Sequence, residues 1–591
     1  MDRYGERMVE VVPTAPVVAS PVELSPVAVA PSNWLASLPT ELLIIIFSHL
    51  DPTSLRRIAL VCKSWYRLTC DNIVWRQIFR VRFPLVGETF TSVIRTAFWR
   101  QELICRETLI KTWYRGRATR RTYTLAQALG QVSDCYADFL RDRFVAFDAN
   151  SGRLAECRMA SGHGVSAESC SIPGGTTAYS TGRHFFLFGR WDGAIFGSLV
   201  DHKNILLNGL HQFQPDKHSS MVTAAHVCPG ELGKPGYVGA FTGDQQGNVF
   251  GWDLREGKCL VKVAVNSSAI VKISSDGRSN LVVLSANGDL NHVTGSFQRR
   301  SQTTKICTFL TTPSVNQANS VSINMLVDYG GGNVVLFDDL KLEIYSFVGS
   351  RHVLQLQPGE QIFRASLEEN QHRYQKKDDK LVGGDPLFMA VLLRSGTVLV
   401  VNVRETEYHV IPATRFVPQM VGQLPPDDTL PPVCAVTLNA LVILVGSRDG
   451  RVEMYDIVTG DFCRKVSERV GKRILANSIG RAESIPVSRI LIDEKLAAGV
   501  VVLGPIVQFF KFGDFYKELE NGRGGRKSYS KEKKRSVDEV QTRIDDYEYQ
   551  RDQRDREYDM FIKYNGEGAG DDPEEEQLEL ALALSASIQD R

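Results

Sequence analysis

The residue types that perform catalysis or bind metals are present in this 591-residue chain, but not in the spacings that such chemistry requires. The 11 cysteines and 11 histidines are dispersed, and no C-x-x-C pair is available for a zinc site. The glycine-rich segment 521–528 departs from the phosphate-binding G-x-x-x-x-G-K-[ST] pattern, because Arg526 separates Gly525 from Lys527. There is also no G-x-S-x-G or H-E-x-x-H motif. The sequence therefore predicts no catalytic residues, no metal site and no cofactor.

Three arginines, Arg190, Arg394 and Arg448, stand in equivalent short turns between apolar runs. If these runs are neighbouring strands of one repeated unit, the three side chains project from the same rim of the molecule. Guanidinium groups suit bidentate binding of phosphate or carboxylate. The hypothesis is a binding face for a protein substrate with an acidic or phosphorylated segment. The alternative is that these are ordinary solvated arginines of turns.

The end of the chain combines acidic, small and apolar residues at helical spacing. One copy of the pattern consists of Glu574, Glu575, Glu576, Leu578, Ala581, Leu582 and Ser585. A second copy, about 200° around the helix, consists of Leu580, Ala583, Leu584 and Ser587. The pattern resembles a double-sided ubiquitin-interacting motif, in which the alanines let the apolar patch of ubiquitin approach and the glutamates meet its basic rim. A helix that is apolar on both sides could instead pack into a dimer or under the rest of the protein.

The charge balance and the cysteines limit the class of protein. Lys plus Arg total 69 and Asp plus Glu total 68, whereas a bulk nucleic-acid binder needs a basic excess, so we expect no nucleic-acid partner. No run of about eighteen apolar residues exists, and we therefore expect no membrane span. The dispersed cysteines favour reduced thiols and hence the cytoplasm and nucleus. The basic run 523–535 is either a nuclear-import signal or a solvated linker.

Residues 138–513 consist of short β-runs that are broken by turns containing Gly and Asp. An apolar run, a tight turn ending in Gly and a second alternating run recur in eight copies, spaced roughly 40–65 residues apart. Several second runs end in an aromatic residue followed by Asp, at Phe147-Asp148, Trp252-Asp253, Phe337-Asp338 and Tyr455-Asp456. One hairpin cannot bury both of its faces, whereas four-stranded blades arranged radially can. The region resembles a divergent WD-repeat β-propeller, for which we expect seven or eight blades.

Residues 34–83 carry dense apolar positions at helical spacing. Leu38-Pro39-x-Glu41-Leu42-Leu43 is followed by Ile46-Phe47-Ser48-x-Leu50 and then by Val61-Cys62-Lys63-x-Trp65. The order and spacing resemble an F-box, although Ser54 stands where an acidic residue is frequent. The apolar positions exceed what a three-helix unit can bury, which favours a partner surface over a self-contained helical hairpin.

The F-box resemblance implies docking onto a Skp-type adaptor, and through it onto a cullin-RING ubiquitin ligase. The residues predicted to bind the adaptor are Leu38, Pro39, Leu42, Leu43, Ile46, Phe47, Leu50, Val61, Cys62 and Trp65.

The expected fold is multidomain, with an α-helical module, an all-β propeller and a charged helical or disordered tail. The expected order is a disordered Pro-rich leader (1–31), the F-box (34–83), a helical connector (84–137), the β-propeller (138–513), a charged linker or helix (514–570) and the ubiquitin-interacting motif (571–591). This order resembles fungal F-box proteins and implies a non-catalytic substrate receptor of an SCF-type ubiquitin ligase. Two alternatives remain: a ubiquitin-reading scaffold that uses the adaptor outside a ligase, and a propeller enzyme with an F-box attached.

The double-sided pattern predicts that a peptide covering residues 570–591 binds two ubiquitin molecules, each weakly. Calorimetric titration should give a stoichiometry of about two. Replacing Ala581 by Gly together with Ser585 by Asp should reduce it to about one, because only one copy of the motif is removed. The matching pair at Ala583 and Ser587 should have the same effect. A stoichiometry of one that is insensitive to the second pair would leave a single-sided site.

Overall fold

A computed structural model describes residues 38–50, 52–170, 175–182, 185–199, 211–229, 237–297, 300–310, 323–368, 381–405, 413–424, 430–467, 470, 474–475, 485–493 and 497–513. The expected leader, the charged segment 514–570 and the expected ubiquitin-interacting segment lie outside these residues. Within the described residues, no helix combines the length and apolar character that crossing a membrane requires. The same part of the chain contains no group of three metal-ligating side chains.

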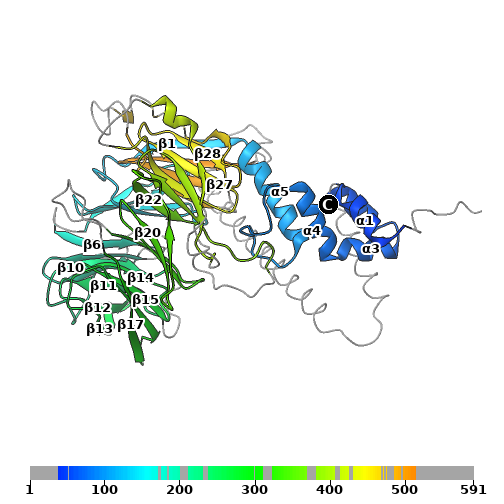
Figure 1. The fold of residues 1–591 in the computed structure, drawn as a ribbon. Helices are drawn as coiled ribbons and strands as arrows, with labels where there is room; N and C mark the ends of the chain where they lie inside the picture. The colour runs from blue at the N-terminus through cyan, green and yellow to red at the C-terminus, as the bar shows by residue number, and fades with distance from the viewer. Residues whose placement is uncertain are drawn as a thin grey trace, which may run out of the picture. The chain divides into compact units, whose positions relative to one another are not determined.

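The amino-terminal part of the described chain is helical (Figure 1). Its helices are α1 (Thr40–Ser48), α2 (Pro52–Ala59), α3 (Lys63–Cys70), α4 (Asn72–Arg82) and α5 (Trp99–Arg115). Pro39 stands at the N-cap of α1, and the carboxylate of Asp71 caps α4 by accepting a hydrogen bond from the Ile73 amide at 2.8 Å. Leu43, Phe47, Trp75 and Phe79 form part of the core of this helical module.

Eight four-stranded antiparallel sheets follow within the described residues. The first four sheets are β2 (Asp134–Asp138), β3 (Arg143–Asp148), β4 (Arg153–Arg158) and β5 (Ser166–Ser169); β6 (Thr176–Thr181), β7 (Phe185–Arg190), β8 (Ile195–Leu199) and β9 (His211–Gln212); β10 (Val222–Val227), β11 (Ala240–Asp244), β12 (Asn248–Asp253) and β13 (Lys258–Ala264); β14 (Ile270–Ser275), β15 (Asn280–Ser285), β16 (Asp289–Ser296) and β17 (Arg300–Thr308).

The next three sheets are β18 (Asn324–Asp328), β19 (Asn333–Phe337), β20 (Leu342–Ser346) and β21 (Arg351–Leu354); β22 (Ile362–Leu367), β23 (Phe388–Leu393), β24 (Val398–Asn402) and β25 (Ala413–Phe416); β26 (Val433–Leu438), β27 (Val442–Ser447), β28 (Val452–Asp456) and β29 (Phe462–Lys465). A 3-10 helix, η3 (Gln419–Gln423), precedes β26. The eighth sheet combines β30 (Arg489–Asp493), β31 (Ala498–Leu503) and β32 (Ile506–Phe512) with β1 (Ala118–Thr124).

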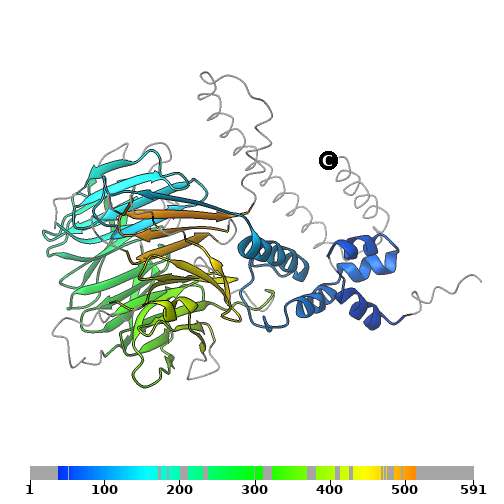
Figure 2. The ribbon, with the colours of Figure 1, turned by 90° about the horizontal axis from the view of Figure 1, so that it is seen from above.

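The sheets are the blades of an eight-bladed β-propeller. The first strands of neighbouring sheets lie beside one another, as β6 does beside β10 and β22 does beside β26. These strands therefore surround the centre, and the later strands of each sheet lie farther out (Figures 1 and 2). Radial packing buries both faces of each sheet, which one hairpin cannot do. Of the seven or eight blades expected from the sequence, eight are present.

The ring is closed by pairing distant parts of the chain. Strand β1 pairs antiparallel with β32 over its whole length, from Ala118 opposite Phe512 to Thr124 opposite Ile506. In both ribbon views the blue β1 lies beside the orange strands of the eighth blade (Figures 1 and 2). The propeller therefore begins at Ala118, and the expected boundary at residue 138 is wrong. The sequence of β1 is mostly polar because it forms an outer edge, so it lacks the apolar pattern of a buried strand.

Glycine turns between second and third strands account for the repeat in the sequence. Gly247 has a φ of +86°, and a Cβ atom there would lie 2.0 Å from the Asn266 carbonyl oxygen. Gly288 has a φ of +84°, and its Cβ atom would lie 2.2 Å from the Phe309 carbonyl oxygen. Only glycine combines this conformation with so close an approach of the backbone.

The aromatic-Asp pairs do not mark one common position, contrary to the sequence prediction. Trp252-Asp253 and Tyr455-Asp456 end third strands, whereas Phe147-Asp148 and Phe337-Asp338 stand at the ends of second strands. Both strand ends need an aspartate whose carboxylate accepts hydrogen bonds from turn amides, as Asp148 does from Asn150 and Asp456 does from Val458. The same local chemistry therefore recurs at two different corners of a blade.

A buried hydrogen-bond network joins the strands of the third blade. His218 Nδ1 lies 3.0 Å from Asp244 Oδ2, and His218 Nε2 lies 2.8 Å from Thr242 Oγ1. The indole of Trp252 donates to the same Thr242 oxygen at 2.8 Å. Burial lowers the pKa of His218, so the imidazole remains neutral. The network satisfies polar groups that would otherwise be buried without partners.

The connector between the helical module and the propeller packs against both. Trp113, near the end of α5, belongs to a core cluster with residues of the seventh and eighth blades, and its ring centroid lies 5.6 Å from that of Phe512. In the opposite direction, Val382 from the propeller lies in the core of the helical module. The Phe90 amide donates to the Gly383 carbonyl at 3.0 Å. We refer to these contacts as the junction.

Buried charges reinforce the junction. Glu102 and Arg106 form an ion pair of 2.9 Å within α5, and both side chains are almost completely buried. Arg106 also donates to the Thr91 carbonyl at 2.6 Å, while the Thr91 hydroxyl donates to Glu368 of the propeller at 2.9 Å. Because unpaired buried charges are strongly destabilising, these contacts fix the connector in one arrangement.

Glu368 should make the stability of the junction depend on pH. Burial raises the pKa of Glu368 to about 7, although Thr91, Arg106 and Arg404 act in the opposite direction. The folded state binds the Glu368 proton more tightly than the unfolded state, whose carboxyl has a pKa of about 4.5. The resulting contribution to stability is fully present below that pKa and is lost as the pH rises through about 7. The free energy of unfolding should therefore decrease between about pH 5 and pH 8, by at most about 3 kcal/mol.

Urea denaturation of the full chain at several pH values measures this effect. Glu368→Gln should flatten the dependence over that interval, because the amide does not ionise. An equal pH dependence in the variant and the wild type would contradict the role of Glu368.

Candidate functional site

Helix α1 is apolar on both of its sides. Leu43 and Phe47 point into the helical core, with 5% and 2% of their surface exposed. Leu42, Ile45 and Ile46 are 46%, 51% and 44% exposed. A helix that is apolar all round is normally buried on every side. The described residues leave this outer face uncovered, which makes it a candidate binding surface.

A second group of exposed apolar side chains lies at the turn between α2 and α3. Leu60 and Val61 occupy this turn, and their side chains are 77% and 63% exposed. The rings of Phe47 and Trp65 meet edge-on with 5.5 Å between their centroids, which holds α3 against α1. We define the outer apolar surface as Leu42, Ile45, Ile46, Leu60 and Val61.

The residues predicted to bind the adaptor divide by their burial. Those that are exposed are Pro39, Leu42, Ile46, Val61 and Cys62. Those that are half-buried are Leu38, Leu50 and Trp65. Leu43 and Phe47 are buried in the helical core. These last two side chains therefore position α1 and are not available to a partner.

Sequence reasoning omitted Ile45, Leu60 and Ile73, which are all exposed. Ile45 follows Leu42 by three residues, and this helical spacing could have placed both on one face. Leu60 follows the end of α2 and Ile73 lies in the first turn of α4, where no periodic pattern distinguishes outward from inward positions. Only the packing of the helices decides the exposure of these two residues.

Basic side chains accompany the outer apolar surface. Arg57, Lys63 and Arg67 are exposed on α2 and α3. Burial raises the pKa of Tyr66, and the neighbouring Cys70 adds to this effect, so the phenol remains neutral. A partner that fits this part of the module would present apolar side chains bordered by acidic ones.

The three turn arginines lie on one rim of the propeller but not in one place. Arg190, Arg394 and Arg448 each stand where the second strand of a blade ends. Arg394 and Arg448 belong to neighbouring blades, whereas Arg190 belongs to the second blade. Arg190 Nε lies 3.9 Å from Asp192 Oδ1, and Arg394 Nη2 lies 3.9 Å from Asp339 Oδ2. Arg394 and Arg448 are therefore neighbours on the rim, whereas Arg190 stands apart from them.

Two further arginines on inner strands lie toward the same rim. Arg364 lies near the start of β22, beside the end of β23 that leads into Arg394, and Arg489 begins β30. Arg364 Nη1 donates to the Ser488 carbonyl at 2.7 Å, and Arg489 Nη1 pairs with Asp134 at 2.5 Å. Burial lowers the pKa of Arg364, and the positive charge of Arg489 acts in the same direction.

We define the arginine rim as Arg364, Arg394, Arg448 and Arg489. Sequence reasoning missed two of these residues because an arginine on a strand carries no signal of the blade end at which it lies. The concentration of like charge on three consecutive blades suits an anionic ligand.

The fold and the outer apolar surface define a class of protein, in which an F-box-like domain is joined to an eight-bladed β-propeller. A family model described as F-box-like matches residues 35–81, which include α1 to α3 and most of α4.

The chain is similar to F-box proteins of two yeasts. The chain is 24% identical over 502 residues to the F-box/WD repeat-containing protein pof10 of Schizosaccharomyces pombe, a match that covers 81% of this chain and 73% of the relative. It is 24% identical over 251 residues to the ubiquitin ligase complex F-box protein UFO1 of Saccharomyces cerevisiae, covering 41% of this chain and 36% of that protein. Among solved structures, BamB from Moraxella catarrhalis matches with a TM-score of 0.41 and 12% identity, covering 67% of this chain and 100% of BamB.

The two sides of α1 should respond differently to truncation. Phe47→Ala should lower the free energy of unfolding of the helical module by about 3–5 kcal/mol, because the ring is buried against Trp65. Ile45→Ala should lower it by less than about 1 kcal/mol, because its side chain is half exposed. Denaturant unfolding followed by tryptophan fluorescence measures both changes. Equal losses would contradict the assignment of inward and outward faces.

Proposed function

We propose that this protein is the substrate-recognition subunit of an SCF-type ubiquitin ligase. The observation that carries the proposal is the outer apolar surface, which lies within the matched F-box-like residues and is uncovered in the described structure. In this role the surface docks a Skp-type adaptor, and the adaptor links the chain to a cullin-RING ligase. The similarity to the ubiquitin ligase complex F-box protein UFO1 of Saccharomyces cerevisiae supports the same class of assembly.

The receptor acts by positioning and supplies no catalytic group of its own. The junction joins the helical module, which carries the outer apolar surface, to the propeller. Its buried ion pair and apolar contacts resist bending between the two. A substrate held on the propeller therefore stays within a limited distance of the ligase. This proximity converts ubiquitin transfer from an encounter in solution into an effectively intramolecular reaction.

The arginine rim supports an acidic or phosphorylated segment as the recognised part of the substrate. Guanidinium groups bind carboxylate and phosphate in bidentate geometry. Arg364 Nη1 donates to the Ser488 carbonyl at 2.7 Å, beside Arg489, which is itself paired with Asp134. Burial and the charge of Arg489 lower the pKa of Arg364, so a bound anion would favour the charged form of Arg364. Arg394 and Arg448 on the adjoining turns extend the same positive surface.

Two finer parts of the proposal concern ubiquitin and the compartment. The chain end 571–591, outside the described residues, would bind ubiquitin through its two copies of the motif and retain substrates that already carry ubiquitin. The 11 cysteines form no disulfide in the described structure, which suits the reducing cytoplasm and nucleus. The alternative is a scaffold that binds the adaptor and ubiquitin but does not join a cullin ligase.

Adaptor binding is the first test. The double variant Leu42→Ser with Ile45→Ser should weaken binding of a purified Skp-type adaptor by about tenfold or more, because two apolar contacts are lost. Leu85→Ser is the matched control, since Leu85 is exposed but lies outside the outer apolar surface. Biolayer interferometry measures the affinities, and circular dichroism checks that the variants are folded.

Unchanged affinity in a folded double variant would overturn adaptor docking at this surface. Purification of the full chain from cells then separates the ligase receptor from the scaffold. The receptor should bring the cullin with the adaptor, and the double variant should lose both. Recovery of the adaptor without the cullin would favour the scaffold.

A further inference from the structure

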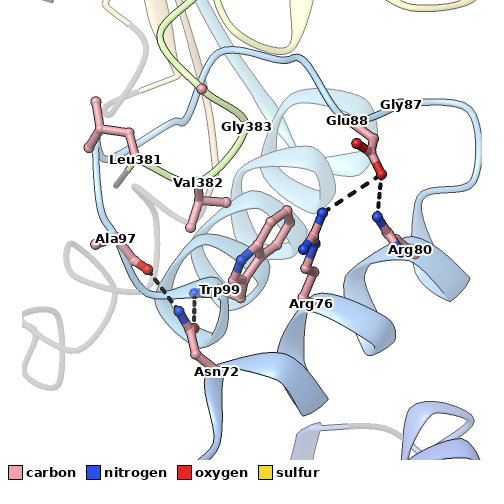
Figure 3. A pocket seen from close by; sticks show the side chains of 11 residues that line it. Asn72, Arg76, Arg80, Gly87, Glu88, Ala97, Trp99, Leu381, Val382 and Gly383 are labelled. Carbon is pink, nitrogen blue, oxygen red and sulfur yellow. Dashed lines mark hydrogen bonds and ion pairs between the residues drawn. The ribbon is translucent and has the colours of Figure 1, made fainter. Parts of the chain in front are cut away.

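A pocket of about 270 Å³ lies where the helical module meets the propeller (Figure 3). Helix α4 supplies Asn72, Arg76 and Arg80, and Trp99 at the start of α5 forms another part of the wall. The propeller contributes segment 381–384. The pocket is distinct from the outer apolar surface and from the arginine rim, and it has no part in the function proposed above.

The walls of the pocket are held by backbone contacts. Asn72 donates to the Ala97 carbonyl at 3.0 Å and accepts from the Trp99 amide at 2.8 Å, which ties the start of α5 to α4. On the opposite wall Gly383 has a φ of +78°, and a Cβ atom there would lie 2.4 Å from the Phe90 carbonyl oxygen. The pocket is therefore a fixed feature of the junction.

Two arginines in the pocket meet the same carboxylate. Arg76 and Arg80 are one helical turn apart, and both point toward Oε1 of Glu88, as Figure 3 shows. The Arg76 contact measures 3.7 Å, and Arg80 donates a hydrogen bond. The Arg76 guanidinium also lies over the Trp99 ring, 5.9 Å from its centroid. Two positive charges face one negative charge, so this group of three carries a surplus of one positive charge.

Glu88 is a weak occupant of this position. Its side chain is 73% exposed, and those of Arg76 and Arg80 are about half exposed. Exposed ion pairs contribute little to stability, typically less than about 1 kcal/mol. An incoming anion therefore displaces Glu88 from the two guanidinium groups at little cost.

We propose that this pocket binds a phosphate monoester and that Glu88 occupies the anion position when the ligand is absent. A phosphate monoester is close to a dianion at neutral pH, so it balances both arginines, which one carboxylate does not. Its oxygens accept the paired N–H groups of guanidinium. The volume is just below the usual range for small-molecule sites, which suits a ligand as small as a sugar phosphate or a single phosphorylated side chain.

Binding in this pocket should also stabilise the junction. The ligand would lie against α4, the start of α5 and segment 381–384 at once, so it favours the state in which these elements are together. Phosphate binding and an increase in melting temperature should therefore appear together.

The test is calorimetric titration of the full chain at low salt with inorganic phosphate, a sugar phosphate and a phosphoserine peptide. We expect binding of about millimolar affinity or tighter to at least one of the two esters, with a higher melting temperature. Arg76→Gln with Arg80→Gln should weaken binding at least about tenfold. Glu88→Gln should tighten binding about fivefold, because the competing carboxylate is removed.

Arg82→Gln is the matched control on the same helix, since Arg82 pairs with Glu107 outside the pocket, and it should leave binding unchanged. Preference for the sugar phosphate or for the phosphopeptide identifies the source of the ester. No binding of any phosphate compound to the wild type and to Glu88→Gln would overturn the proposal. Binding that survives loss of Arg76 and Arg80 but is lost with Arg364→Gln would assign the ligand to the arginine rim and would also overturn it.

Discussion

The buried ion pair between Glu102 and Arg106 holds the connector in place, and the arrangement of both candidate surfaces depends on it. The carboxylate also accepts hydrogen bonds from the Ser92 hydroxyl and the Val93 amide, so the chain before α5 is tied to the helix. Arg106 and Glu368 share Thr91 as a partner, which adds a polar link between α5 and the propeller. Loss of either member of the pair would leave a buried charge without compensation, and this would lower the free energy of unfolding by about 3–5 kcal/mol.

The junction is strong because apolar packing crosses it in both directions. Trp113 extends into the propeller core, and Val382 extends into the helical core. Neither module therefore has a separate core that is complete at this boundary. In the proposed role as a substrate receptor, this arrangement would limit the positions that a bound substrate could reach relative to the adaptor.

The two candidate binding surfaces differ in chemical character: the outer apolar surface belongs to the helical module, and the positively charged arginine rim belongs to the propeller. The outer apolar surface suits a lasting partner, because burial of apolar area supplies affinity and the bordering basic side chains Arg57, Lys63 and Arg67 add a salt-dependent contribution. The arginine rim suits a ligand whose charge can change, since phosphorylation adds nearly two negative charges at neutral pH. The ion cluster of Arg76, Arg80 and Glu88 combines both signs of charge. Its exposed Glu88 carboxylate occupies the position that an anion would take.

The sequence by itself determined the helical module, the repeated blades and the glycine turns, because each depends on residues close together in the chain. The spacing of Leu43 and Phe47 and the positive φ of Gly247 and Gly288 are examples of such local requirements. Only the tertiary structure decided that β1 closes the ring, since its partner β32 lies at the other end of the propeller and its own sequence is polar.

The same distinction applies to the candidate sites. Exposure of Ile45 and Leu60 depends on how the helices pack, and the approach of Arg364 to Arg489 depends on closure of the blades around one centre. Contacts between distant residues follow from the way all the blades pack together, and no local pattern of residues encodes them.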